Sequence, residues 1–203
     1  MLYIIDYGSG NLRSVQKAFE HVGVFAEIGS DPKRMRDAGG LVLPGVGAFG
    51  AAMAELERRG LAEAIVERVA AGVPCLGVCL GLQLLFERSE ESPGVPGLGL
   101  VQGDVRRLPP ALKVPHIGWN QVECMKESDL LADIPEGSAF YFVHSYAVVP
   151  ARPADVLTIT EYGVTFVSGI ERENLAAFQF HPEKSSALGL RLYENFARRV
   201  YRS

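Results

Sequence analysis

Short apolar runs alternate with helical patterns through the first part of the chain, and this alternation leaves few folds open. Four apolar segments have the length and flanking turns of buried strands: 2–5, 24–28, 41–43 and 73–78. Between them, apolar residues recur at helical spacing in the segments 12–22, 31–38 and 50–71, the last broken at Gly60. Because strands joined through helices run parallel, and helices then cover both faces of the sheet, the pattern predicts a parallel α/β sheet.

The second half of the chain has another character. Short segments rich in β-branched and aromatic residues are separated there by turns: 103–108, 120–125, 139–149, 155–162, 164–172 and 175–180. They predict antiparallel strands and hairpins added to the same sheet. A helical pattern at 185–201, with Ser185 or Ser186 as N-cap candidates, closes the chain. We therefore expect a three-layer α/β fold with a mixed, mostly parallel central sheet flanked by helices.

Composition limits the kinds of partner. The 203 residues, 48% of them apolar, suffice for one core, so we expect a single domain over residues 1–203. Lys and Arg number 20 against 24 Asp and Glu, and without a basic run this balance argues against nucleic acid as a partner. The N-terminus does not resemble a signal peptide, and no run of about 18 apolar residues occurs. We expect a cytoplasmic protein without a membrane partner.

The three cysteines, Cys75, Cys79 and Cys124, are an odd number without CxxC spacing. This pattern argues against a disulfide framework and against a zinc site, and we expect neither a metal nor another cofactor. For Cys75 and Cys124, packing in the core is a sufficient explanation.

Cys79 differs from the other two because it lies between Gly77 and Gly81, where an apolar run turns into a helical pattern. A strand, a G-x-C-x-G turn and a helix have the form of a nucleophile elbow, in which close backbone approach requires glycine beside the reactive residue. The start of a helix also favours a thiolate. From this spacing alone, packing in a central strand remains the alternative.

A nucleophile needs a base, and the chain has four histidines. His181 follows the apolar segment 175–180, and Glu183 is two residues further on, where an extended backbone returns side chains to the same face. A carboxylate there can accept the second ring N–H and stabilise the imidazolium form. Cys79, His181 and Glu183 would then be nucleophile, base and orienting acid. His144, in a long apolar segment, is expected to be a structural or interface histidine.

A glycine-rich loop follows the third predicted strand, in the segment 41–50. Its backbone N–H groups, with that of Leu80, could stabilise the negative charge that develops when a thiolate attacks a carbonyl. Gly45, Gly47 and Gly50 also match the GxGxxG pattern of dinucleotide-binding proteins. That fold has its glycines after the first strand and an acidic residue at the end of the next one, whereas here the next strand ends in a cysteine. Nucleotide binding therefore ranks below acyl transfer.

Several separated motifs occur together in one order. They are "LVLPGVGAFG", "PCLGVCLGLQLLF" with Cys79, and "FQFHPEKSS" with His181 and Glu183. In this combination the chain resembles the class I, triad-type glutamine amidotransferases, which have a flavodoxin-like fold. Within that family, "IIDYGSGNLRSV", "VPHIGWN" at 114–120 and "FYFVHSY" at 140–146 resemble the glutaminase subunits of imidazole glycerol phosphate synthase.

The resemblance implies hydrolysis of glutamine to glutamate and ammonia through a thioester on Cys79, with His181 and Glu183 completing a triad. It implies an oxyanion and substrate site formed by Gly45, Val46, Gly47 and Leu80, and a glutamine head-group site formed by Gln83, Glu91, Ser145 and Tyr146. Gln83 is also four residues after Cys79, so a helix after the elbow would place it near the same opening.

The resemblance also implies a partner. A cyclase subunit with a (β/α)8 barrel would use the ammonia to convert the ribulosyl phosphate intermediate PRFAR to imidazole glycerol phosphate and AICAR in histidine biosynthesis. His116, Trp119 and Asn120 would lie at the interface with it, and the cyclase would gate the glutaminase.

Three alternatives stay open. The chain could serve another synthase, such as one for anthranilate or pyridoxal phosphate. It could be a nucleotide-binding oxidoreductase that uses the glycine-rich loop, or a catalytically silent binding protein with the same fold.

Overall fold

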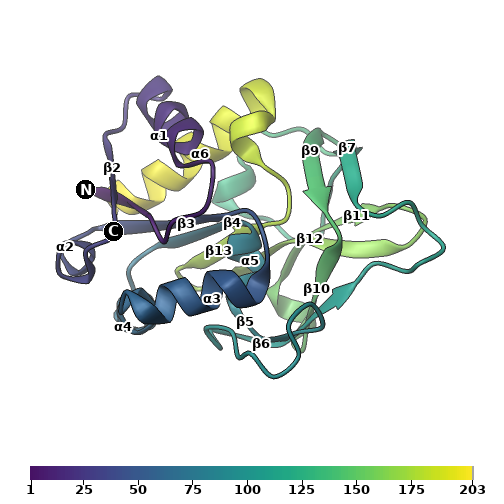
Figure 1. Cartoon of the computed structure of the whole chain (residues 1–203). Coiled ribbons are helices and arrows are strands. Elements are labelled where there is room, and N and C mark those ends of the chain that lie inside the picture. Colours follow the sequence, from purple (N-terminus) through teal and green to yellow (C-terminus); the bar gives the residue numbers. More distant parts are fainter. Residues whose placement is uncertain (203) are drawn as a thin grey trace.

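Helices cover both faces of one large sheet in the computed structural model, which describes residues 1–202. Helices α1 and α6 lie on one face, and α3 and α4 on the other (Figure 1). The helices are α1 (Leu12–His21), α2 (Pro32–Arg36), α3 (Phe49–Arg58), α4 (Leu61–Ala70), α5 (Leu80–Leu84) and α6 (Ser186–Arg202). None of these helices, all within residues 1–202, has the length and apolar character needed to cross a membrane.

The large sheet joins a parallel half to an antiparallel half. The strands are β1 (Leu2–Ile5), β2 (Ala26–Gly29), β3 (Gly40–Gly45), β4 (Cys75–Cys79), β5 (Phe86–Ser89), β6 (Val101–Arg107), β7 (His116–Gln121), β8 (Glu123–Cys124), β9 (Ala139–His144), β10 (Tyr146–Pro150), β11 (Val156–Glu161), β12 (Thr165–Arg172) and β13 (Leu175–Phe178). The main path runs β2-β1-β3-β4-β13-β12-β10-β6-β5, with β11 paired to β12 and to β8.

Neighbouring strands from β2 to β13 are parallel, whereas β13, β12, β10 and β6 are successively antiparallel. The carboxyl ends of the parallel strands β1, β3 and β4 therefore meet at one edge of the sheet. In open α/β sheets, ligands bind outside that edge, near the point where the strand order reverses. The topology thus marks this edge as the place to look for a site.

Side chains alternate between two cores, one on each face of the sheet. Tyr3 and Ile5 of β1 belong to the core that includes residues of α3 and α4, whereas Leu2 and Ile4 belong to the core that includes residues of α1 and α6. All four are fully buried, because successive side chains of a strand point to opposite faces. Burial on both faces explains why the parallel strands are continuous apolar runs in the sequence.

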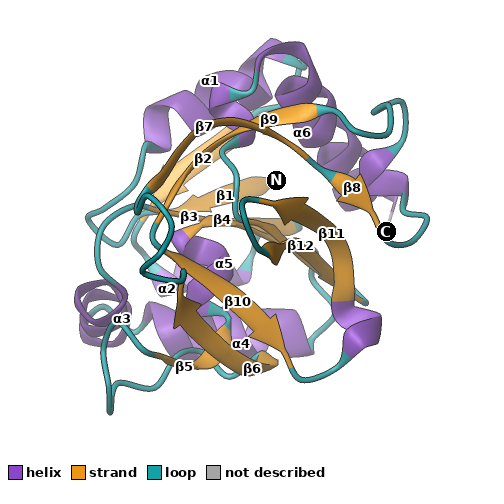
Figure 2. Ribbon diagram, turned by 90° about the vertical axis from the view of Figure 1, so that its right-hand side faces the viewer, coloured by secondary structure: helices purple, strands orange, loops and turns teal. Residues whose placement is uncertain are grey.

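The expected three-layer fold with a mixed sheet is confirmed, with corrections in the detail. The segment 139–149, expected as one strand, breaks at Ser145 into β9 and β10. Strand β9 pairs with β7 in a separate two-stranded sheet, beside α6 and apart from β10 (Figure 2). The prediction that all these strands join one sheet was therefore wrong, because alternation of apolar residues shows which face is buried and not which strand is the neighbour.

The segment after Cys79 also differs from the prediction. Its helical pattern continues only to Leu84, and the strand β5, which was not predicted, begins at Phe86. Leu82, Leu84 and Phe86 are all fully buried. A short run buried on all sides fits a helix and a strand equally well, so its periodicity could not distinguish them.

Candidate active site

Cys79 stands at a sharp turn between β4 and α5. Its backbone has φ 54° and ψ −109°, a strained positive-φ conformation that residues other than glycine rarely adopt. The neighbouring glycines permit the turn, because a Cβ on Gly81 would collide with the carbonyl oxygen of Leu43, and one on Gly77 would lie 2.9 Å from the Cβ of Ala177. The predicted elbow geometry is present, and it brings the cysteine to the carboxyl edge of the sheet.

His181 and Glu183 follow β13, the neighbour of β4. Nδ1 of His181 lies 2.8 Å from Oε1 of Glu183, and both side chains are buried. The hydroxyl of Tyr193 in α6 donates to the other carboxylate oxygen at 3.2 Å. On the opposite side of the ring, Nε2 has no hydrogen-bond partner among the described residues, and His181 and Cys79 line the same pocket. The three predicted triad residues are thus brought together.

The charge state of His181 depends on these neighbours. Burial lowers the pKa of His181, but Cys79 and Glu183 both raise it, and the net result is a pKa raised to about 9. At neutral pH the arrangement favours a protonated imidazole beside the cysteine.

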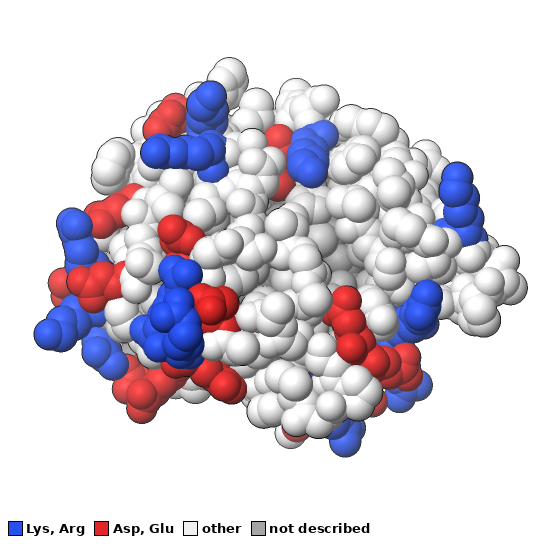
Figure 3. All heavy atoms as spheres, viewed as in Figure 1, with Lys and Arg blue, Asp and Glu red and all other residues white. Residues whose placement is uncertain are grey.

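A pocket of about 420 Å³ opens at this edge of the sheet. Its lining includes most residues expected around the substrate: Val46, Gly47, Leu80, Gln83, Glu91, Ser145 and Tyr146. Gly45 is not in the lining but pairs with Cys79 across β3 and β4, directly behind the elbow. Figure 3 shows charged side chains gathered over α2, α3 and α4, whereas the middle of this face is mostly uncharged.

The glycine-rich loop is held from the end of β1. The hydroxyl of Ser9 donates to the carbonyl of Val46 at 2.6 Å, which fixes one peptide group of the loop. Gly47 has φ 99°, a conformation that favours glycine. Leu80 provides the first N–H after the nucleophile, at the start of α5. The loop and the helix therefore place backbone groups on two sides of the pocket.

The start of α3 is already occupied by side chains of this chain. Glu91 accepts a hydrogen bond from the N–H of Phe49 at 2.8 Å, and the hydroxyl of Ser92 accepts one from the N–H of Gly50 at 3.0 Å. In dinucleotide-binding folds the corresponding N–H groups bind the pyrophosphate. A carboxylate in that place disfavours a second anion, so this contact argues against the GxGxxG alternative.

Gln179, which the sequence analysis missed, lies between Gln83 and the sulfur. The Nε2 of Gln83 donates to the carbonyl of Tyr146 at 3.2 Å and to Oε1 of Gln179 at 3.1 Å. Nε2 of Gln179 in turn donates to Sγ of Cys79 at 3.7 Å. Gln179 is fully buried, and a buried amide between apolar residues of a predicted strand was the signal that could have revealed it. Tyr193 and Ser9 were missed as well.

The three expected interface residues do not share one surface. Trp119 is exposed over 54% of its surface, next to the equally exposed Ile117. His116 is only 3% exposed and so offers no surface to a partner, and Asn120 is half-buried. In β7, residues an even number apart share a face, so His116 and Asn120 point inward while Trp119 points outward. Period-two alternation in the sequence could have shown this.

Comparison with known proteins agrees with the motifs. Residues 3–200 match the family described as "Glutamine amidotransferase class-I". The "Imidazole glycerol phosphate synthase subunit HisH" of Moorella thermoacetica is 53% identical over 197 residues, covering 97% of this chain and 94% of that protein. The protein of the same name from Aquifex aeolicus is 54% identical over 199 residues, covering 97% and 96%.

A solved structure described as "Crystal structure of glutamine amidotransferase" has a TM-score of 0.75 at 20% identity and covers 98% of each chain, which supports the fold. The resemblance of the sequence motifs is confirmed by these matches. The chain belongs to the class I glutamine amidotransferase family, among the HisH subunits of imidazole glycerol phosphate synthase.

Proposed function

We propose that the chain hydrolyses glutamine to glutamate and ammonia at the pocket of Cys79. One observation carries the proposal: a strained cysteine and a buried histidine line one pocket, and a carboxylate lies 2.8 Å from the far nitrogen of the histidine. This is the arrangement that acyl transfer through a covalent intermediate needs.

In the first half-reaction, the thiolate of Cys79 attacks the side-chain amide carbon of glutamine. A carbon–sulfur bond forms and the carbon–nitrogen bond breaks. The departing nitrogen takes a proton from His181 and leaves as ammonia. N–H groups of Leu80 and of the Gly45–Gly47 loop stabilise the oxyanion before the bond breaks.

In the second half-reaction, water hydrolyses the glutamyl thioester. His181, now neutral, accepts a proton from the water while its oxygen bonds to the carbonyl carbon. The carbon–sulfur bond breaks and restores the thiolate beside the protonated ring, and the glutamate acid then ionises in solvent. Glu183 keeps the ring in the required orientation through Nδ1 in both steps.

The head group of glutamine would be held by the rest of the pocket lining. Gln83 uses both N–H groups within the protein, so its Oε1 is the atom left for the substrate. Glu91 carries the charge that suits the α-ammonium group, while Ser145 and Tyr146 lie on the β9–β10 side. These assignments fit an amino-acid substrate in a pocket whose surroundings are otherwise mostly uncharged.

The ammonia would pass to a second subunit. The relatives are named as subunits of imidazole glycerol phosphate synthase, so the acceptor is expected on a (β/α)8-barrel cyclase subunit that converts PRFAR to imidazole glycerol phosphate and AICAR. Exposed Trp119 and Ile117 offer it a contact surface. We further propose that residues 1–203 act as one glutaminase domain, in the cytoplasm.

A labelling experiment and a turnover assay test the proposal together. A glutamine analogue with an electrophilic carbon should modify Cys79 and no other cysteine, and glutamate release should rise when cyclase and its ligand are added. Cys124→Ser is the matched control, because Cys124 is a half-buried thiol outside the pocket. Unlabelled Cys79 in the presence of active cyclase, or full turnover in its absence, would contradict the mechanism or the gating.

Growth of a histidine auxotroph separates this function from other glutaminases. A strain lacking its glutaminase subunit should grow on low ammonium when this chain and a matching cyclase are supplied. Rescue of an anthranilate or pyridoxal phosphate auxotroph instead would assign the chain to another synthase.

A further inference from the structure

Two buried histidines that the mechanism does not use form a hydrogen-bonded chain beside the pocket. Nδ1 of His116 lies 3.0 Å from Nε2 of His144, and Nδ1 of His144 lies 2.8 Å from the carbonyl oxygen of Tyr146. At the other end, Nδ2 of Asn120 lies 3.3 Å from Nε2 of His116 and 2.9 Å from the carbonyl oxygen of Glu161. The chain therefore runs from β7 through β9 to the first residue of β10.

The contacts determine where each proton lies. A carbonyl oxygen only accepts, so Nδ1 of His144 carries the hydrogen. Burial lowers the pKa of His144 to about 4, so the ring is neutral at pH 7 and its Nε2 is an acceptor. Nδ1 of His116 must then donate, and since burial also lowers the pKa of His116, its Nε2 accepts from Asn120. The donors of both rings therefore point toward Tyr146.

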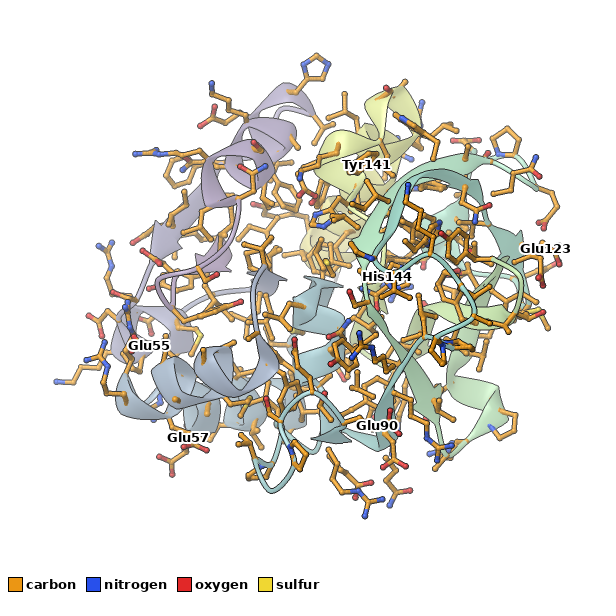
Figure 4. The ribbon with its side chains drawn as sticks, turned by 45° about the vertical axis from the view of Figure 1, so that its right-hand side comes forward. Glu55, Glu57, Glu90, Glu123, Tyr141 and His144 are labelled. Carbon is orange, nitrogen blue, oxygen red and sulfur yellow. The ribbon has the colours of Figure 1, made fainter. Side chains whose placement is uncertain are left out.

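Aromatic side chains hold both rings in place. His116 stacks on Tyr162 with ring centroids 4.0 Å apart and on Phe142 at 5.0 Å, and His144 packs against Phe166 at 5.0 Å. Both histidines are almost fully buried. Figure 4 places His144 near the middle of the molecule, whereas Glu55 and Glu123 lie at its rim. The rings cannot turn without disturbing this packing, so the direction of the chain is fixed.

His144 lines the catalytic pocket, and the chain is linked to the glutamines of that pocket through one carbonyl oxygen. The carbonyl oxygen of Tyr146 accepts from His144 and also from Nε2 of Gln83. Gln83 continues to Gln179, and Gln179 to the sulfur of Cys79. The position of this carbonyl thus decides how the amide of Gln83 is oriented in the pocket.

We propose that His116 and His144, both as the Nδ1–H tautomer, are positioning residues that hold the Tyr146 carbonyl and so orient Gln83 toward glutamine. Asn120 sets the direction of the chain from the edge of β7. The kinetic consequence rests on the proposed glutaminase function, whereas the tautomers do not. A pair that merely fills space would have no preferred tautomer and would tolerate any ring of similar size.

Nitrogen NMR of the histidine rings in the chain alone tests the tautomers. In the wild type, Nδ1 of His116 and of His144 should each carry a proton, and both Nε2 atoms should be unprotonated. In Asn120→Asp an acceptor replaces the donor that faces His116, while the oxygen that accepts from the N–H of Gln121 is kept. Nε2 of His116 should then become protonated. A proton on either Nε2 in the wild type overturns the proposal.

Steady-state kinetics with cyclase present tests the positioning. His144→Phe keeps an aromatic ring but removes the donor to Tyr146, and we expect KM for glutamine to rise about tenfold with a smaller change in kcat. His144→Asn keeps an N–H near the position of Nδ1 and should restore KM to within about threefold of the wild type. His21→Asn, on the exposed side of α1, is the control.

The two hypotheses fail in different ways. If the wild type releases no glutamate with cyclase, the proposed function is wrong. The NMR result alone then tests the proposed tautomers of His116 and His144. If the wild type is active and the Phe and Asn variants share its KM, the positioning role is overturned. A folded His144→Phe protein is verified by its circular dichroism, and the wild-type NMR needs no variant.

Discussion

Two histidines, His181 after β13 and His144 at the end of β9, line the same pocket and have opposite charge preferences. After β13, burial alone would lower the pKa of His181, but Cys79 and Glu183 outweigh it and raise the pKa to about 9. On β9, burial dominates and lowers the pKa of His144 to about 4, since its ring meets a carbonyl and a second histidine. An adjacent anion, and not the depth of the ring, decides which histidine can exchange protons with a substrate.

Removing the Glu183 carboxylate should reduce the difference in pKa between the two histidines. Glu183→Gln keeps the shape of the side chain but removes its charge, so the pKa of His181 should fall. An amide N–H facing Nδ1 would also favour the wrong tautomer, and we expect kcat to decrease by about 10³-fold. The measurement is glutamate release as a function of pH, with cyclase and its ligand present.

Glu123→Gln is the matched control for that variant, because Glu123 is exposed on β8, far from the pocket (Figure 4). It should leave kcat and the pH profile as in the wild type. A Glu183→Gln enzyme that keeps more than about a tenth of the wild-type kcat would show that the carboxylate does not act through His181.

The features that could be predicted from the sequence depend on residues that lie close together in the chain. Cys79 was recognised because two glycines and a change of periodicity surround it, and these requirements all lie within a few residues. His181 and Glu183 were recognised because alternation along an extended backbone places them on one side. The strands of the parallel half were predicted for the same reason, since burial on both faces makes each of them a continuous apolar run.

Contacts between distant segments were not predictable. Gln179 contacts Cys79 across 100 positions in the chain, and Ser9 contacts Val46 across 37. A local pattern can mark Gln179 as a buried amide, but it does not identify the partner in either contact. Tyr193 lies within the helical pattern predicted at 185–201, and that pattern does not indicate that its hydroxyl donates to the triad carboxylate. A side chain's partner depends on how strands are ordered in the sheet, and one sequence alone does not specify that order.

The two histidines should also differ in how they make the free energy of unfolding depend on pH. Between pH 6.5 and 4 the unfolded chain binds a proton that buried His144 resists, so the free energy of unfolding should fall with pH by on the order of 3 kcal/mol from this residue. His181 has the opposite sign: its contribution is fully present below pH 6.5 and is lost as pH rises through about 9.

Urea unfolding of His144→Asn, measured at several pH values, isolates the contribution of His144 to the loss of stability at acid pH. We expect the variant to be less stable than the wild type at pH 7, and this difference in the free energy of unfolding should narrow as pH falls from 6.5 to 4. His21→Asn should keep the wild-type slope. If the gap stays constant, His144 is protonated alike in the folded and unfolded chain, and the comparison between the two histidines fails.

The smallest expected effect concerns the hydrogen bond from Tyr193 to the carboxylate of Glu183. Tyr193→Phe removes the hydroxyl that donates to Oε2 of Glu183 at 3.2 Å and keeps the ring, whose centroid lies 4.7 Å from that of Phe19. One lost hydrogen bond to a buried carboxylate should reduce kcat by about threefold to tenfold, with KM for glutamine unchanged. Because Glu183 would be less firmly placed beside His181, the alkaline limb of the kcat profile should also move to lower pH. A variant that loses thermal stability but keeps the wild-type profile would show that the hydroxyl serves the fold alone, and that Oε1 suffices to hold the ring.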